Sequence, residues 1–143
     1  AGYWRDAAAT AAVMRPGGWY ATGDLGRIDP GDGAVFIVGR LKELIIRSGF
    51  NVYPAEVEAV LNAFAPIRLS AVVGVPEGDG NEQVLAFVEL RAGAALDEAA
   101  LAQHLAAHLT AYKRPARVQV LPALPLTANG KLLKRALPLP AAP

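Results

Sequence analysis

Residues 39–58 read GRLKELIIRSGFNVYPAEVE, and the order of the segments in this stretch decides the fold class. The runs Leu44–Arg47 and Phe50–Val52 flank the dipeptide Ser48-Gly49, which is typical of a tight turn between two short strands. A proline follows, which suits the first turn of a helix, and acidic residues lie near the positive helix end. The stretch therefore predicts a small β-hairpin followed by a helix over Pro54–Ala65.

The same pattern continues on both sides of this stretch. Asp97 is a plausible N-cap for the second helix, whose leucines recur at four-residue spacing. The order β-β-α-β-β-α-β over residues 35–121 predicts an α+β domain in which helices cover a short mixed sheet. The further segments expected are a hairpin of Leu25–Asp29 and Ala34–Val38, an antiparallel pair of Leu69–Val75 and Val84–Leu90, a helix over Leu96–Leu109 and a strand over Arg117–Leu121.

A domain boundary is expected near Arg40–Lys42, because the chain before it is glycine-rich and strand-like. We expect three parts: a β-rich part over residues 1–40, a small domain over 41–137 with its own core, and a tail over 138–143. The sequence begins AGYWRDAAAT, without an initiator methionine or the features of a signal peptide, so we expect it to begin inside a longer protein.

Composition excludes several classes of protein. The chain has 143 residues, of which 53% are hydrophobic and 19% charged, so it can fill a core. A net charge of +1 predicts no nucleic-acid partner. There are no cysteines, which excludes disulfides and thiolate chemistry and fits a cytoplasmic location. All charged residues after position 98 are basic, which indicates either a solvated face or a surface for an anionic ligand.

The segment Tyr20-Ala21-Thr22-Gly23-Asp24 is the first candidate site. A carboxylate that follows a glycine in a tight turn can accept hydrogen bonds from a vicinal diol, such as that of a ribose. The glycine would let the ligand approach the backbone closely. Thr-Gly-Asp is also a common plain turn, so this segment alone leaves both interpretations open.

The second candidate lies in the opening stretch itself. Arg40 supplies a rigid fork of donors, and Lys42 lies where two folding units are expected to meet and where the backbone can turn. Ser48-Gly49 offers its backbone to a narrow ligand or a moving surface. A plain hairpin with solvated cations would explain the same residues.

The third candidate is PLTANGK, residues 125–131. Asn-Gly predicts a tight turn that presents Lys131 on a loop, where its charge can meet reacting carboxylate and phosphate groups. The alternative is an ordinary surface lysine. His104 and His108 lie four residues apart on the second expected helix, but the sequence offers no third ligand beside them, and we expect no metal site.

Taken together, the three motifs resemble one family. GWYATGDLGRID, GRLKELIIRSGFNVYPAEVE and PLTANGKLLKRAL occur in the order found in the C-terminal part of the adenylate-forming enzymes, and the resemblance covers roughly residues 2–137. That superfamily includes acyl- and aryl-CoA synthetases, peptide-synthetase adenylation domains and beetle luciferases. The stretch SGFNVYPAEVE is most similar to fatty- and aryl-acyl-CoA ligases, although many relatives have Gly-Gly in place of Ser48-Gly49.

The resemblance implies a role for each candidate residue. Nucleotide binding is implied for Asp24 and Arg40, which would contact the ribose of ATP or AMP, together with Tyr20 and Thr22 of the same motif. Lys42 would be the hinge, and Ser48-Gly49 would line the tunnel for coenzyme A after the hinge turns. Lys131 would be the catalytic lysine that forms the acyl-adenylate. Residues 1–40 would be the end of the large domain, and residues 41–137 the lid domain.

The implied activity is that of an AMP-forming acyl-CoA ligase, with ATP, Mg²⁺ and coenzyme A used by the full enzyme. A carboxylic acid would be converted to acyl-AMP and then to its thioester. The partners would be the missing N-terminal domain, the acid, coenzyme A, and an acetyltransferase and deacetylase acting on Lys131. The fragment alone is expected to be inactive and to hold no cofactor tightly. The alternatives are a peptide-synthetase adenylation domain and a stand-alone lid-like binding module, and the chain carries no acyl pocket that would identify the acid.

Overall fold

The computed structural model describes residues 2–140, so the end of the tail expected over residues 138–143 lies outside the described residues. The chain divides into two compact units, Ala1–Lys42 and Glu43–Pro143. The boundaries expected at residues 40 and 137 stay a prediction. Within residues 2–140, no helix combines the length and the apolar composition needed to cross a membrane.

The first unit consists of a short helix and two two-stranded ribbons, and none of its described residues is buried. The expected hairpin is present, and its strands pair in antiparallel register from Ile28↔Val35 to Asp24↔Arg40. No helix was predicted before residue 18, but Asp6 caps one by accepting a hydrogen bond from the Ala9 N–H at 2.8 Å. The elements are α1 (Ala7–Val13), β1 (Met14–Arg15), η1 (Pro16–Gly18), β2 (Trp19–Tyr20), β3 (Asp24–Ile28) and β4 (Val35–Arg40).

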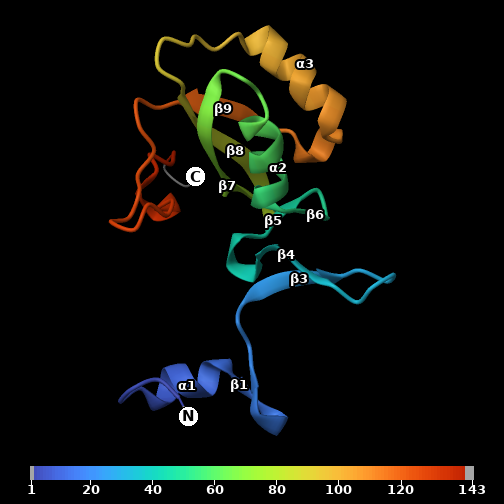
Figure 1. Ribbon diagram of the computed structural model, residues 1–143, viewed down its shortest axis with the longest axis vertical. Helices are drawn as coiled ribbons and strands as arrows, with labels where there is room; N and C mark the ends of the chain where they lie inside the picture. The colour runs from blue at the N-terminus through green and yellow to red at the C-terminus, as the bar shows by residue number, and fades with distance from the viewer. Residues whose placement is uncertain (1, 141–143) are drawn as a thin grey trace. The chain divides into compact units, whose positions relative to one another are not determined.

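The second unit has the predicted order β-β-α-β-β-α-β (Figure 1). Strand β7 pairs with β8 in antiparallel orientation, and β8 pairs with β9 in parallel orientation, so the sheet is mixed and the α+β prediction is confirmed. The elements are η2 (Leu41–Glu43), which straddles the unit boundary, β5 (Ile45–Arg47), β6 (Phe50–Val52), α2 (Pro54–Asn62), β7 (Ile67–Gly78), β8 (Asn81–Leu90), α3 (Glu98–His108), η3 (Ala111–Lys113), β9 (Arg117–Val120) and η4 (Lys134–Ala136).

Strand β8 lies at the centre of this sheet and is buried on both faces. Because successive strand side chains point to opposite faces, Val84, Ala86 and Val88 pack with α2 and α3. Leu85 and Phe87 lie in a second cluster. That second cluster also contains Leu124 and Leu137. The segment after β9 therefore covers part of this face of the sheet, whereas helices cover the other face.

Helix α2 and strand β7 both end at other residues than predicted. Helix α2 ends at Asn62 rather than Ala65, because the chain turns towards β7 through hydrogen bonds from the Phe64 N–H to Leu61 O and from the Ile67 N–H to Phe64 O. Strand β7 continues through Pro76 although proline cannot donate a backbone hydrogen bond. It is tolerated there because β7 is an edge strand and its register shifts between Pro76 and Gly78.

Candidate functional site

Asp24 and Arg40 are direct cross-strand partners at one end of the β3–β4 ribbon. Arg40 Nε lies 3.3 Å from Asp24 Oδ1, and the Arg40 side chain is 70% exposed. The pair places a carboxylate acceptor beside an accessible guanidinium donor. This is the combination that the diol-binding hypothesis requires.

The turn before Asp24 is held by its own polar groups. Thr22 Oγ1 accepts a hydrogen bond from the Asp24 N–H at 3.0 Å, and Gly23 O accepts one from the Leu41 N–H at 2.8 Å. Gly23 has a φ of +77°, which a side chain would strain. Threonine therefore shapes the turn through its hydroxyl, and its glycine neighbour permits the backbone conformation.

Tyr20 lies on β2 and shares a 2.9 Å hydrogen bond with the Tyr3 hydroxyl. This hydrogen bond is the largest cause that raises the pKa of the Tyr20 phenol, and the Asp24 charge adds to the effect. The phenol therefore stays neutral and can donate or accept a hydrogen bond. All four residues predicted for nucleotide binding thus lie in the first unit.

Ser48 and Gly49 form the turn between β5 and β6, where Arg47 pairs with Phe50. Both turn residues have positive φ, 51° and 78°, as a two-residue hairpin turn requires. The Ser48 N–H donates to Asn81 Oδ1 and the Ile46 N–H donates to Glu82 Oε2, each at 2.7 Å. Side chains at the start of β8 therefore satisfy backbone donors along the outer edge of β5.

The hairpin is also fixed from the side of η3. The Phe50 ring stacks on Tyr112 with centroids 4.6 Å apart, and Arg47 Nη1 donates to Arg114 O at 2.8 Å. The motifs did not indicate that Asn81, Glu82 or Tyr112 supports this turn. They are distant in the sequence from Ser48-Gly49, which itself remains exposed.

Lys131 lies on a small hairpin formed by residues 125–133. Leu126 and Leu132 form an antiparallel bridge, and the Leu133 N–H donates to Pro125 O at 2.8 Å. At the tip, the Thr127 N–H donates to Lys131 O at 2.7 Å, and the Lys131 N–H donates back to Thr127 Oγ1 at 3.1 Å. The backbone of Lys131 is therefore defined although the residue is exposed.

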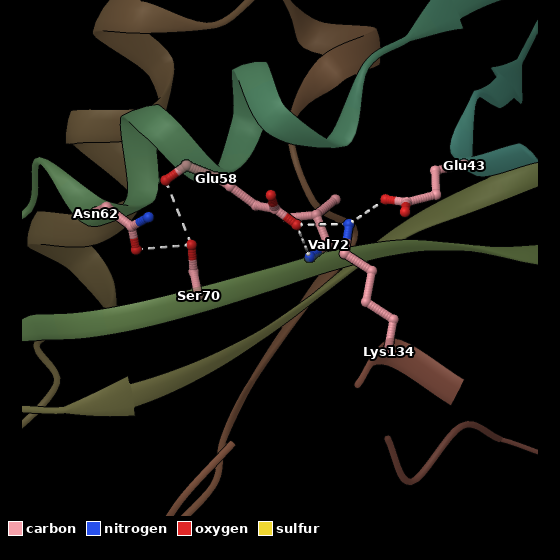
Figure 2. Close-up of polar contacts among 6 residues, drawn as sticks. All are labelled: Glu43, Glu58, Asn62, Ser70, Val72 and Lys134. Atoms are coloured by element: carbon pink, nitrogen blue, oxygen red, sulfur yellow. Dashed lines mark hydrogen bonds and ion pairs between the residues drawn. The ribbon is translucent and has the colours of Figure 1, made fainter. Parts of the chain in front are cut away.

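The two lysines of this segment have different environments. Lys134 Nζ contacts Glu43 Oε2 at 2.7 Å and Glu58 Oε1 at 2.9 Å (Figure 2). The Lys131 side chain makes no hydrogen bond or ion pair within residues 2–140. Only Lys131 can therefore offer its charge to a ligand without first breaking an ion pair.

Lys42 is exposed and lies in η2, at the last position of the first unit. Its neighbour Glu43 begins the second unit and is held there by Lys134. A residue in this position can change its backbone angles without disturbing the core of the second unit, as a hinge requires. In the second unit, the Ser48-Gly49 turn and Lys131 belong to different elements, and no hydrogen bond or ion pair within the described chain joins them.

Residues 2–140 contain no group of three or more His, Cys, Asp or Glu side chains that could hold a metal ion. His104 and His108 are instead bonded to the backbone: His104 Nε2 to Val60 O at 2.9 Å, and His108 Nδ1 to His104 O at 2.8 Å. Glu43 and Glu58 share the Lys134 ammonium.

Comparison with known proteins decides the family. The model of the AMP-binding enzyme C-terminal domain matches residues 56–131, which is just over half of the chain. The chain belongs to this family. The match includes the three-stranded sheet, helix α3, most of helix α2 and Lys131, so it lies within the unit that has its own core.

Relatives of this AMP-binding C-terminal domain match almost the whole chain. The 2-succinylbenzoate–CoA ligase of Geobacillus kaustophilus is 45% identical over 136 residues, which are 95% of this chain and 27% of the relative. The long-chain-fatty-acid–CoA ligase of Bacillus subtilis is 42% identical over 136 residues, which are 95% of this chain and 24% of the relative. The chain thus spans about a quarter of the length of these curated relatives.

Solved structures also match almost the whole chain. ATP-bound MatB from Rhodopseudomonas palustris is 42% identical with a TM-score of 0.84, and the match covers 94% of this chain and 26% of that one. The amide bond synthetase McbA from Marinactinospora thermotolerans is 41% identical with a TM-score of 0.83, covering 94% and 27%. Proteins similar to this chain therefore include CoA ligases and an amide bond synthetase.

Proposed function

We propose that the chain is the C-terminal part of an ATP-dependent, AMP-forming acid–CoA ligase. The observation that carries this proposal is the exposed Lys131 ammonium, held on a hydrogen-bonded hairpin of an AMP-binding C-terminal domain. In the first half-reaction, a carboxylate oxygen attacks the α-phosphorus of ATP, and the bond to pyrophosphate breaks. In the second, the thiol of coenzyme A attacks the acyl carbon, loses its proton and displaces AMP.

Lys131 serves the first half-reaction in this proposal. Negative charge develops on the phosphoryl oxygens as the new bond forms, and a placed ammonium stabilises that charge. Asp24 would accept hydrogen bonds from the ribose hydroxyls, and Arg40 would donate to the same part of the nucleotide, while Thr22 and Tyr20 keep this segment in place. Mg²⁺ would neutralise phosphate charge, but the described residues offer no ligand set for it, so we assign it to the nucleotide and the rest of the enzyme.

The Ser48-Gly49 turn serves the second half-reaction. Its exposed backbone, braced by Asn81 and Phe50, would line the path of the coenzyme A thiol once the domain has turned about Lys42. One small domain would thereby supply a cation to one step and a narrow backbone surface to the next. The proposal includes a carboxylic acid and coenzyme A as substrates and a cytoplasmic location. It also states that the isolated chain is inactive.

The test uses the full-length gene product that contains these residues, with a panel of fatty, aryl and dicarboxylic acids. Wild-type protein should release pyrophosphate and form a CoA thioester with at least one acid. Lys131→Ala should lower adenylation about 10²–10³-fold, as expected when one preorganised electrostatic donor is lost. It should still convert supplied acyl-AMP and coenzyme A to thioester at near wild-type rate. Arg135→Ala removes an exposed cation four residues away and is the matched control.

Two results would contradict parts of the proposal. If no carboxylate supports pyrophosphate release by wild-type protein, the ligase function is wrong. If Lys131→Ala slows both half-reactions equally, the function can stand but the role of Lys131 is wrong.

The likeness to the amide bond synthetase McbA favours a second candidate, in which an amine is the acyl acceptor. A peptide-synthetase adenylation domain, which passes its acyl group to a carrier thiol, is the remaining enzyme alternative. Replacing coenzyme A by amines in the same assay separates the first of these from a CoA ligase. A lid-like binding module without chemistry would show no ATP consumption with any acceptor.

We further propose that Lys131 is a target of an acetyltransferase and a deacetylase. The side chain is exposed and free of ion pairs within the described residues, and acetylation would remove the charge on which adenylation depends. Mass spectrometry of protein isolated from its native source should find the acetylated peptide. Uniformly unmodified Lys131 across growth conditions would refute this regulation.

A further inference from the structure

Lys134 joins three segments that are far apart in the sequence (Figure 2). It lies in η4, three residues after Lys131, and its ammonium contacts Glu43 at the end of η2 and Glu58 on α2. The Lys134 side chain is 21% exposed and that of Glu58 is 17% exposed. The contact is therefore partly shielded from solvent, which strengthens it relative to an open surface pair.

The Glu58 carboxylate is itself held by the sheet. Its Oε1 atom, which contacts Lys134, also accepts a hydrogen bond from the Val72 N–H on β7 at 2.8 Å. Near the same place the buried Ser70 donates to Asn62 Oδ1 at 2.9 Å and to Glu58 O at 3.3 Å, which ties α2 to β7 (Figure 2). The anchor for Lys134 is therefore a fixed carboxylate of the domain core.

This anchor lies at one foot of the hairpin that carries Lys131. Directly beyond it, the buried Leu137 packs in the second core cluster. At the other foot, the Leu124 N–H donates to Glu89 Oε2 at 3.0 Å, and Leu124 is buried in the same cluster. The hairpin tip is thus exposed while both of its feet are fixed to the sheet.

We propose that Lys134 is a positioning residue for adenylation, a role that rests on the function proposed above. By bridging Glu43 and Glu58, it fixes the Lys131 hairpin to the domain core and to the residue next to the hinge candidate Lys42. When the domain turns, the Lys131 ammonium then moves with it as one body. Positional accuracy matters because a misplacement of about 1 Å at a reacting centre can cost about 10²-fold in rate.

The same helix provides a matched control. Lys113 Nζ contacts Glu56 Oε1 at 2.6 Å, and the Lys113 side chain is 20% exposed, nearly the same as that of Lys134. Glu56 and Glu58 both belong to α2, but Lys113 lies in η3 and makes no hydrogen bond or ion pair to the Lys131 hairpin within residues 2–140. Removing Lys113 costs one ion pair and removing Lys134 costs two, and only Lys134 lies beside the hairpin.

The experiment measures both half-reactions in the full-length protein. Lys134→Met keeps the length and apolar stem of the side chain but removes its charge, and it should lower kcat of adenylation tenfold or more. Thioester formation from supplied acyl-AMP should stay within about twofold of wild type, which also reports that the protein is folded. Lys134→Arg should restore adenylation to within about threefold, and Lys113→Met should leave adenylation within about twofold.

A second arm tests whether Lys134 acts through the carboxylates. Glu58→Gln should lower adenylation, and the Lys134→Met/Glu58→Gln double variant should be no slower than Lys134→Met alone, because Lys134→Met already removes the contact between Lys134 and Glu58. Unchanged adenylation in Lys134→Met, or equal losses in both half-reactions, would overturn the positioning role. A wild-type protein that consumes no ATP with any acid would instead refute the proposed ligase function, so the two failures are distinguishable.

Discussion

The charge state of the Glu89 carboxylate affects the stability of the second unit. Arg68 Nε donates to its Oε1 atom, and the Leu124 N–H donates to Oε2 at 3.0 Å. These two hydrogen bonds, that from Arg68 first, lower the pKa of the Glu89 carboxyl. The folded state therefore holds this proton less tightly than the unfolded state, in which a glutamate has a pKa of about 4.3.

The sign of the resulting pH dependence follows from linkage. Glu89 contributes stability that is fully present above about pH 4.3 and is lost as the pH falls through its lower folded-state pKa. At pH 6, Glu89→Gln should therefore be less stable than wild type in urea unfolding followed by far-UV circular dichroism. The difference in free energy of unfolding should shrink as the pH falls from 6 to 3. A difference that stays constant over that range would contradict the assignment.

Single residues also mark what the sequence could and could not predict. Asp24, Arg40, Ser48-Gly49 and Lys131 belong to local motifs, and their turns form where the motifs indicated. Lys134 and Glu43 contact each other across 91 positions, and the Ile46 N–H reaches Glu82 across 36. No local pattern encodes such a contact, because it depends on how finished elements pack.

Gly74 on β7 shows how a missing side chain creates space between elements. A Cβ atom there would lie 2.8 Å from Glu82 Oε1 and 3.1 Å from Ile45 Cγ1. The Glu82 carboxylate passes over this glycine to accept the Ile46 N–H of β5. Gly74 thereby lets β8 satisfy a backbone donor of the hairpin that carries Ser48-Gly49.

Gly74→Ala should destabilise the second unit by about 1–3 kcal/mol, because the added methyl forces either Glu82 or Ile45 to move. Urea unfolding followed by far-UV circular dichroism measures the loss. The control is the same substitution in a Glu82→Ala background, where part of the collision is relieved and the added cost should be smaller. Equal costs in both backgrounds would show that Glu82 does not fill the space over Gly74.

The accuracy of the predicted elements depends on the kind of signal each one carries. Helix α3 has leucines at helical spacing, and strands β7 and β8 have runs of residues that favour strands. Both the type and the order of these elements were predicted. Helix α1 was missed because AAATAAV carries no apolar stripe and its stabilising cap is the single hydrogen bond of Asp6. The end of α2 was placed three residues late, since a tertiary turn ends it before Pro66.

The two units of the molecule differ in how much buried core stabilises them. The second unit contains both core clusters, whereas no residue from 2 to 42 is buried. The first unit pairs its strands only in two-stranded ribbons, and a lone ribbon is marginally stable at best in water. It also exposes large apolar side chains, among them Trp4, Trp19, Phe36 and Ile37.

The 143-residue chain taken alone should therefore fold as one stable unit with a labile segment before it. Amide hydrogen exchange should show strong protection in β7, β8 and α2 and little in β3 and β4, because exchange follows local opening. Both tryptophans lie in the first unit, with Trp4 85% and Trp19 76% exposed. Urea should thus produce a cooperative circular-dichroism transition with little accompanying change in tryptophan emission.

The control for the exchange experiment is the full-length protein, in which β3 and β4 should become protected if further chain covers their apolar side chains. Equal protection of β3 and β8 in the isolated chain would show that the ribbons need no such cover.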